Sequence, residues 1–205
     1  MKIISHRGKY SKKSHENSIK TILRADKLLP KYIEIDIQQN YQGDLILSHD
    51  LVADMNHQEQ KQLPRLIDLL NNTLKSTLLI EIKQPGISKK ILALINKKGA
   101  NSFTTFSLED AVYIKDNANY EVFIMQRVHP FGLMKKCLHN KLDGVGVNKN
   151  WLVLLPFIYR KCQSNNKKMF LYTVNSKPLA RFLTVIMPNI YICTDNTKEF
   201  SESLR

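Results

Sequence analysis

Apolar and polar residues alternate strictly over residues 32–38, YIEIDIQ, where isoleucines are separated by Glu34 and Asp36. A period of two is typical of a β-strand with one apolar face and one polar face. The two carboxylates on the polar face repel each other, and burying them without a positive partner would be very costly. The pattern therefore indicates a strand whose polar face belongs to a site that also contains positive charge.

In three further segments, a short apolar run contains or is followed by acidic, basic or histidine side chains. The segment Ile-Glu-Ile-Lys repeats the alternation and places Glu81 and Lys83 on one side. At the start of the chain a short run ends in His6 and Arg7, and a third run is followed by His49. Several strand ends thus carry acids, histidines and cations, which is a pattern typical of a site.

Runs with strand or helix periodicity alternate along the rest of the chain. The expected strands are residues 2–5, 32–38, 78–83, 102–105, 121–126, 142–147, 169–174 and 190–193, with a short extra run over 45–47. The expected helices are residues 16–29, 63–70, 88–96 (ended by Gly99), 108–116 (capped by Ser107), 133–139, 151–162 and 178–185, and a polar helix after Asn196. Residues 51–62 are polar and are predicted to form a loop.

Eight strands alternating with helices predict an α/β fold with a parallel sheet, and eight is the number that closes a (β/α)8 TIM barrel. An open doubly wound sheet is the structural alternative, but no glycine-rich phosphate loop follows the first strand. The 205 residues are expected to form a single domain, compact for a barrel. In a barrel the polar strand ends would point into the mouth, and the isoleucines would pack outward against helices.

Lysine and arginine outnumber the acids and give a formal net charge of +13, which favours anionic partners. The lysines form dispersed pairs without interleaved aromatic residues, so a solvated surface is favoured over a nucleic-acid patch. Transient contact with an anionic membrane surface stays open. Cys137, Cys162 and Cys193 have no metal-ligand spacing and are expected to be reduced and buried. No membrane-spanning run or signal-peptide core is found, so a cytoplasmic location is expected.

Five short motifs occur in a fixed order in the first half of the chain. They are His6-Arg7-Gly8, Glu16-Asn17-Ser18, Glu34-Ile35-Asp36, His49-Asp50 and Glu81-Ile82-Lys83. In this set and order the chain resembles the glycerophosphodiester phosphodiesterase family, and similar marks at 105–107, 172–175 and 194–195 extend the resemblance over nearly the whole chain. The resemblance implies a TIM barrel, with a reduced insertion between the second and third strands. It also implies a glycerophosphodiester or lysophospholipid as the small-molecule substrate.

The resemblance gives each motif residue an expected role. Glu34, Asp36 and Glu81 offer hard oxygen ligands, which suit one divalent cation, Mg²⁺ or Ca²⁺. His6 and His49 would be the general acid and base, although the sequence does not say which is which. A site of two histidines and one carboxylate for non-haem iron also fits by residue type, but it would leave Arg7 and Lys83 unexplained.

Arg7 and Lys83 are expected to bind phosphate, with ordinary salt bridges to the acids as the alternative. Glu16 and Asn17 would either orient the groups of the site or simply cap the first helix. The remaining histidines, His15, His57, His129 and His139, are expected to face solvent, and Trp151 to pack against the barrel.

Three functions remain open at this point. The first is a metal-dependent phosphodiesterase that releases sn-glycerol 3-phosphate and an alcohol, by attack of either water or the neighbouring glycerol hydroxyl. The second is a lysophospholipase D-type or lyase activity on a lipid headgroup at a membrane surface. The third is a non-catalytic module that binds anions or nucleic acid.

Overall fold

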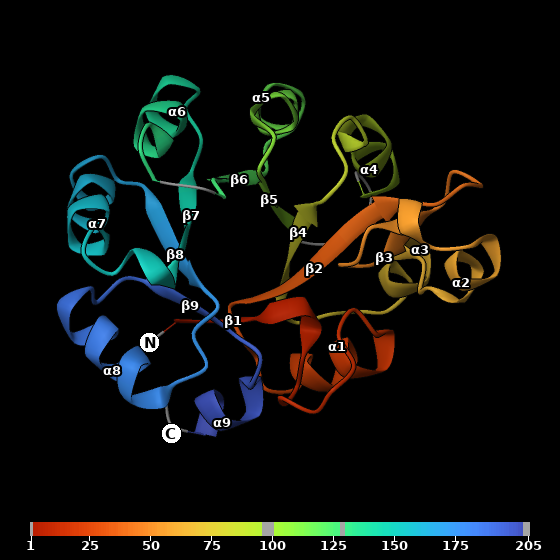
Figure 1. Ribbon diagram of the computed structural model, residues 1–205, viewed down its shortest axis with the longest axis horizontal. Coiled ribbons are helices and arrows are strands. Elements are labelled where there is room, and N and C mark those ends of the chain that lie inside the picture. Colours follow the sequence, from red (N-terminus) through yellow and green to blue (C-terminus); the bar gives the residue numbers. More distant parts are fainter. Residues whose placement is uncertain (1, 96–100, 128–129, 203–205) are drawn as a thin grey trace.

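In the computed structural model, which describes residues 2–95, 101–127 and 130–202, eight parallel strands close into a barrel (Figure 1). The strands are β1 (Lys2–Ser5), β2 (Tyr32–Gln39), β4 (Thr77–Ile82), β5 (Asn101–Thr105), β6 (Glu121–Met125), β7 (Gly144–Asn148), β8 (Lys168–Tyr172) and β9 (Tyr191–Thr194). β1 pairs with both β9 and β2, which closes the sheet. The expected TIM barrel is confirmed, and the open doubly wound sheet is excluded.

Helices surround the barrel in Figure 1 and connect one strand to the next. They are α1 (Ile19–Asp26), α2 (His57–Gln62), α3 (Leu66–Leu70), α4 (Ser88–Ile95), α5 (Leu108–Asn117), α6 (Leu133–His139), α7 (Leu155–Ser164), α8 (Lys177–Ile186) and α9 (Thr197–Glu202), with 3₁₀ turns η1 (His6–Gly8), η2 (Val52–Asp54) and η3 (Lys149–Trp151). Among the described residues, no helix has both the length and the hydropathy to cross a bilayer. The expected helix end at Gly99 lies outside the described residues.

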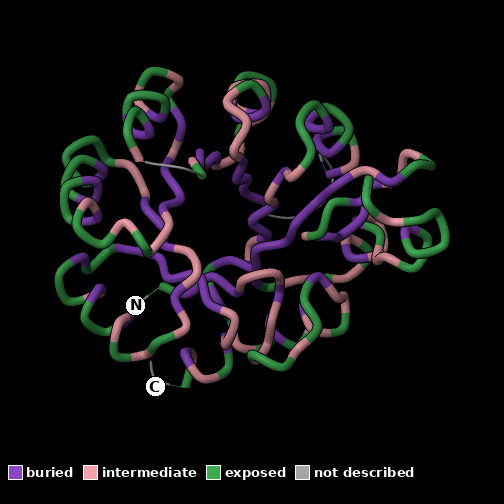
Figure 2. The backbone as a smooth tube through the Cα atoms, viewed as in Figure 1, coloured by how far each residue is buried: buried purple, intermediate pink, exposed green. Residues whose placement is uncertain are grey.

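Apolar side chains are buried on both faces of the barrel wall, and the barrel strands are mostly purple in Figure 2. The outward isoleucines of β2 pack into the core beneath the helices, as expected. A second cluster is made of residues that alternate with these: Ile4, Tyr32, Leu79, Phe123, Met125, Phe170, Tyr191 and Cys193. This cluster fills the barrel interior below the mouth. Gly144 and Gly146 make room for it, since a Cβ at either would meet Phe123 or Phe170 within 2.7 Å.

The segment between the second and third barrel strands contains more structure than its sequence predicts. β3 (Leu45–Leu47) pairs antiparallel with β2 outside the barrel. The expected loop over 51–62 is wrong, because η2 and α2 occupy most of it. The side chain of Asn56 accepts hydrogen bonds at the start of α2, and the Asn56 N–H donates to the Glu59 carboxylate. This capping box stabilises a polar helix that has no apolar stripe to reveal it.

All eight barrel strands lie within two residues of their expected bounds, but three helices begin later than expected. The first begins at Ile19, so Glu16 and Asn17 precede it and do not form its first turn. The seventh begins at Leu155, because residues 151–154 form a separate turn and Pro156 lies in the first helical turn. Leu63 and Pro64 likewise precede α3. For α3 and α7 the apolar pattern continues into the flanking segment, whereas the residues before α1 are polar and contact Asp36 and Arg7.

Candidate active site

Three carboxylates meet at the carboxyl ends of β2 and β4. Asp36 and Glu81 are direct partners in the parallel register, and Glu34 lies two residues before Asp36 on the same face. One oxygen from each of the three side chains lies within 4.8 Å of the others. Glu34 and Asp36 are buried, and Glu81 is nearly so. The alternation seen in the sequence therefore builds one acidic cluster in the barrel mouth.

Burial and mutual repulsion make the ionised cluster unfavourable by itself. Burial raises the pKa of Glu34 well above its usual range, and the charges of Asp36 and Glu81 raise it further. Burial also raises the pKa of Glu81, with a second contribution from Asp36. Glu34 Oε1 is buried and has no hydrogen-bond partner among the described residues. Three convergent hard oxygens, one of them unpartnered, fit a divalent cation such as Mg²⁺ or Ca²⁺.

Two cations contact the acids of the cluster. Lys83 Nζ lies 3.0 Å from Glu81 Oε1 and 3.5 Å from Asp36 Oδ1. Arg7 donates its backbone N–H to Glu34 Oε2 at 2.7 Å, and its Nε lies 3.4 Å from Asp36 Oδ2. Burial alone would lower the pKa of both cations, but the surrounding carboxylates raise it, so both stay charged. The ion pairs with the acids are thus present, and phosphate binding by these two cations stays a prediction.

Glu16 and Asn17 support this arrangement rather than cap the first helix. Asn17 donates from Nδ2 to Asp36 Oδ2 at 2.9 Å and accepts the Asp36 N–H at 3.1 Å. Its backbone takes the left-handed conformation, with φ of 50°, and its N–H donates to the carbonyl of Arg7. Glu16 accepts from Arg7 Nη1 at 2.8 Å. The two residues therefore orient an acid and a cation, which favours the orienting role over simple capping.

His6 is held by a carboxylate that the sequence did not single out as a site residue. Its Nδ1 lies 2.8 Å from Asp195 Oδ1, and Asn175 Nδ2 donates to Asp195 Oδ2 at 2.6 Å. Burial would raise the pKa of Asp195, but hydrogen bonds from His6 and Asn175 lower it far below its usual range. The available signal was the position of Thr194-Asp195 at the end of the last strand, where a barrel places site residues.

His49 follows β3, which pairs with β2 outside the barrel wall. The N–H of Ser48 donates to the carbonyl of Asp36 at 3.1 Å, which sets His49 beside the carboxyl end of β2. Its Nδ1 lies 3.1 Å from Asp50 Oδ1. The His49 side chain is 36% exposed, against 18% for His6, so the two histidines have different surroundings. Neither belongs to the acidic cluster among the described residues, which disfavours the two-histidine iron site.

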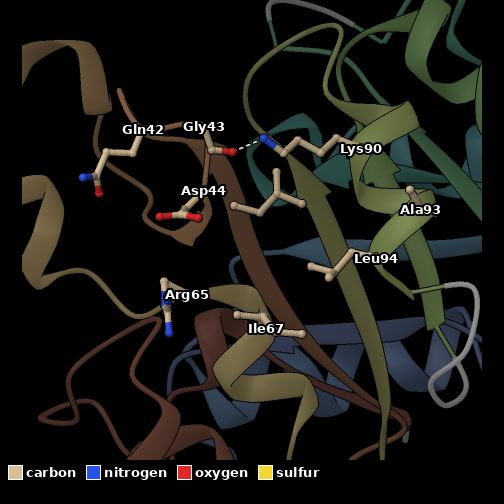
Figure 3. Close-up of a pocket in the computed structure, with 9 residues that line it drawn as sticks. Gln42, Gly43, Asp44, Arg65, Ile67, Lys90, Ala93 and Leu94 are labelled. Atoms are coloured by element: carbon tan, nitrogen blue, oxygen red, sulfur yellow. Dashed lines mark hydrogen bonds between the residues drawn. The ribbon is translucent and has the colours of Figure 1, made fainter.

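Two grooves open near the β2–β3 hairpin. One, of about 470 Å³, lies between the hairpin, α3 and α4, and the acidic residues of the mouth do not line it (Figure 3). The other, of about 410 Å³, is lined by Gln38, Leu51, Lys83 and Pro85 among others. Because Lys83 also contacts the cluster, the second groove adjoins the candidate site.

The remaining expectations concern residues away from the mouth. His15 and His139 are exposed, and His57 is exposed while stacked on Tyr41. His129 lies outside the described residues. Trp151 packs against the core, and the three cysteines are free and buried, as expected.

A closed barrel with acids, a histidine and two cations at the carboxyl ends of its strands has the arrangement of a TIM-barrel catalytic site. No model of a protein family matches the chain. A glycerophosphodiester phosphodiesterase from Caldanaerobacter subterraneus is 24% identical over 221 positions, covering 85% of this chain and 86% of that protein. The resemblance to the glycerophosphodiester phosphodiesterases is thereby confirmed.

Solved structures show the same fold at low identity. A glycerophosphodiester phosphodiesterase from Thermotoga maritima superposes with a TM-score of 0.84 at 18% identity, covering 99% of this chain and 97% of that one. A phosphodiesterase from Oleispira antarctica, solved with the product sn-glycerol 3-phosphate, has a TM-score of 0.83 at 16% identity and covers 100% of this chain and 96% of that one. The chain thus spans nearly the full length of these relatives.

Proposed function

We propose that the chain is a phosphoric diester hydrolase that cleaves glycerophosphodiesters to sn-glycerol 3-phosphate and an alcohol, with residues 1–205 forming one domain. The observation that carries the proposal is the convergence of Glu34, Asp36 and Glu81 between Arg7 and Lys83 in the barrel mouth. Relatives of the same fold and length carry this activity in their names, and one holds the proposed product.

The three carboxylates would hold one divalent cation, Mg²⁺ or Ca²⁺. When bound, such an ion neutralises phosphoryl oxygens and orients the ester. Arg7 and Lys83 add to this charge, and Arg7 can present a planar fork to two phosphate oxygens. These groups stabilise the extra negative charge of the transition state, because they are fixed in place by Glu16, Asp36 and Glu81 before the substrate arrives.

His6 and His49 would carry the proton transfers. An ionised Asp195 can only accept hydrogen bonds, so His6 Nδ1 carries the proton and the Nε2 lone pair of the neutral ring is left to act as a base. One histidine takes a proton from the attacking oxygen, and the other gives one to the leaving alkoxide. Removing either should lower the rate by at least about 10²-fold.

The attacking oxygen belongs either to water or to the neighbouring glycerol hydroxyl. Attack by the hydroxyl gives a cyclic phosphate before glycerol 3-phosphate, whereas attack by water does not. Phosphorus NMR during turnover distinguishes the two routes by the presence of the cyclic species.

A lysophospholipid is the second candidate substrate. The groove beside Lys83 has apolar residues, Leu51, Val52 and Pro85, in its lining. We place the alcohol or acylglycerol part of the substrate in this groove, because Lys83 lines the groove and also contacts the acidic cluster.

The test is a panel of glycerophosphocholine, glycerophosphoethanolamine and lysophospholipids, each with Mg²⁺, Ca²⁺ or chelator. Turnover that needs the metal and is lost in His6→Ala and His49→Ala supports the proposal, with exposed His139→Ala as the matched control. A folded protein with no metal-dependent turnover on any substrate would instead indicate a non-catalytic anion-binding module.

A further inference from the structure

Large apolar side chains are exposed on two adjacent loops at the mouth end of the barrel. Phe131 lies between β6 and α6, and Leu152, Val153 and Phe157 lie at or just before the start of α7. Val153 is 92% exposed and Phe157 68%. Both loops follow the carboxyl ends of their strands, so they lie at the same end as the acidic cluster.

A groove of about 330 Å³ joins the two loops into one surface. Its apolar lining includes Phe131, Leu154 and Phe157, and Lys135 and Lys161 line it as well. α6 and α7 lie side by side in Figure 1. We call these exposed side chains and the groove between them the α6–α7 patch.

The turn before α7 holds the apolar tips outward. The N–H of Leu154 donates to the carbonyl of Trp151 at 2.8 Å, and that of Leu155 to the carbonyl of Leu152 at 3.3 Å. Trp151 packs into the core below and anchors the turn. The exposure of Leu152 and Val153 is therefore built into a hydrogen-bonded turn, and their burial in a partner would cost little ordering of the backbone.

Positive charge predominates in the segment that carries the patch, although one of its basic residues, Lys141, lies with Asp143 in the loop before β7. Residues 126–164 contain seven lysines and arginines, and their one acid is Asp143. Asp143 precedes β7, at the opposite end of the strand, where it pairs with Lys115 at 2.8 Å. Lys135, Arg160 and Lys161 are exposed beside the apolar tips. An acidic surface with an apolar interior is the complementary partner.

We propose that the α6–α7 patch docks the protein on an anionic phospholipid bilayer, with the barrel mouth facing the lipid. Aromatic and aliphatic tips rimmed by lysine suit the boundary between headgroups and acyl chains, and the lysines attract anionic headgroups. This goes beyond the proposed function, because docking is a property of the surface and can be measured without turnover.

The experiment is co-sedimentation of the purified protein with vesicles of phosphatidylcholine, either alone or mixed with phosphatidylglycerol. We expect binding only to the mixed vesicles, weakened by salt because the basic rim is exposed. Val153→Asp and Phe157→Glu should each lower the bound-to-free ratio at least about ten-fold, since each puts a charge into the lipid boundary.

Matched controls come from α8, which lies elsewhere on the helical ring. Val185 is 79% exposed and Phe182 60%, so Val185→Asp and Phe182→Glu make the same changes on comparably exposed side chains and should bind as the parent does. Lys161→Glu changes the charge by two units and should weaken binding by roughly twenty-five-fold, from about five-fold per unit charge. Lys27→Glu, exposed at the far end of α1, should have little effect.

Three outcomes overturn the proposal. One is absence of binding to the mixed vesicles, and another is equal loss in the patch and control variants. The third is a dimeric parent that becomes monomeric in Val153→Asp and does not bind vesicles, because a second copy of the chain would then cover the patch. Turnover of soluble glycerophosphocholine, measured in parallel, should not change in the patch variants, so a failure of docking is distinguished from a failure of the proposed activity.

Discussion

At the scale of single residues, the support of His6 is the feature with the most direct consequences. Asp195 fixes the orientation of the His6 ring, and Asn175 fixes Asp195 through Nδ2 while its Oδ1 accepts the Asp195 N–H at 2.9 Å. Asp195 therefore acts through His6 and is a positioning residue. His49 has a corresponding neighbour in Asp50, but that side chain is 81% exposed and its contact with His49 is solvated.

Asp195→Asn should lower kcat by at least about 10²-fold while KM changes little, because the His6 ring loses its fixed tautomer but the phosphate-binding groups remain. Steady-state kinetics measured as a function of pH test this prediction. The limb of the pH–rate profile that reports the general base should shift in the variant. Asp50→Asn is the matched control and should stay within a few-fold of the parent. Equal losses in the two variants would contradict a special role for Asp195.

The Asp195 carboxylate should also make the free energy of unfolding depend on pH. Because the pKa of Asp195 is lower in the folded protein than its unfolded value of about 4, its ionised form stabilises the fold above that pH. We expect the parent to be more stable than Asp195→Asn by about 1.5–3 kcal/mol near neutral pH. The difference should shrink as the pH falls below about 4 and Asp195 becomes protonated. Urea unfolding at a series of pH values tests this, and a constant difference would refute it.

The alternation around Glu34 and Glu81 was sufficient to predict which side chains share the acidic cluster, since a period of two fixes the face. It could not reveal the contact between His6 and Asp195, which are 189 residues apart. That contact exists because barrel closure pairs β1 with β9, and no local pattern carries this information.

At the scale of elements, η1 connects the first strand to the site and depends on left-handed backbone. Arg7 and Gly8 both have positive φ, of 51° and 64°. A Cβ at Gly8 would lie 2.2 Å from Ile22 Cγ1 and 3.3 Å from its Cα, so α1 packs directly on this glycine. The turn places the Arg7 N–H on Glu34, and the close approach of α1 thus supports the acidic cluster.

Gly8→Ala should destabilise the protein by about 2–4 kcal/mol, from about 1 kcal/mol of left-handed strain plus the clash with Ile22. Gly86→Ala is the control, because Gly86 also has positive φ, of 86°, but a Cβ there meets nothing within 4 Å. It should cost only about 1 kcal/mol. The free energy of unfolding in urea measures both, and similar losses would show that the contact with Ile22 is unimportant.

The sequence predicted elements well where burial imposes a period and poorly where polar contacts decide. β2 is buried along almost its whole length and was located within one residue of its end. α2 was missed because Asn56 and Glu59 stabilise it through the backbone rather than through an apolar face. The first helix was drawn too long because Asn17 uses its side chain for Asp36 and its backbone turns left-handed there.

At the scale of the whole molecule, the alternation of eight strands with helices predicted a parallel sheet and favoured the closed barrel, but it left an open doubly wound sheet as the alternative, because helices follow the strands in both folds. The position of the mouth followed from the strand direction. The α6–α7 patch was not predicted, because an apolar residue such as Val153 or Phe157 looks the same in the sequence whether it is buried or exposed.

The acidic cluster also has a consequence for the stability of the whole fold. A divalent cation bound by the three carboxylates should raise Tm by about 5–10 °C at a hundred-fold excess over its Kd. Glu34→Gln should abolish this shift, because it removes a ligand oxygen, while Glu109→Gln on the exposed face of α5 should preserve it. Differential scanning calorimetry with Mg²⁺, Ca²⁺ and chelator is the measurement. A shift that survives in Glu34→Gln would place the ion elsewhere.

The aromatic and aliphatic filling of the barrel has one more consequence. Phe123, Phe170 and Tyr191 belong to the cluster that fills the barrel interior beneath the carboxylates, so among the described residues the barrel axis is occupied by side chains. Substrate and products would therefore enter and leave the carboxylate cluster through the barrel mouth. A reagent large enough to block the barrel mouth would then trap a ligand bound at the carboxylates. The two products of ester cleavage would leave by the same route, one after the other.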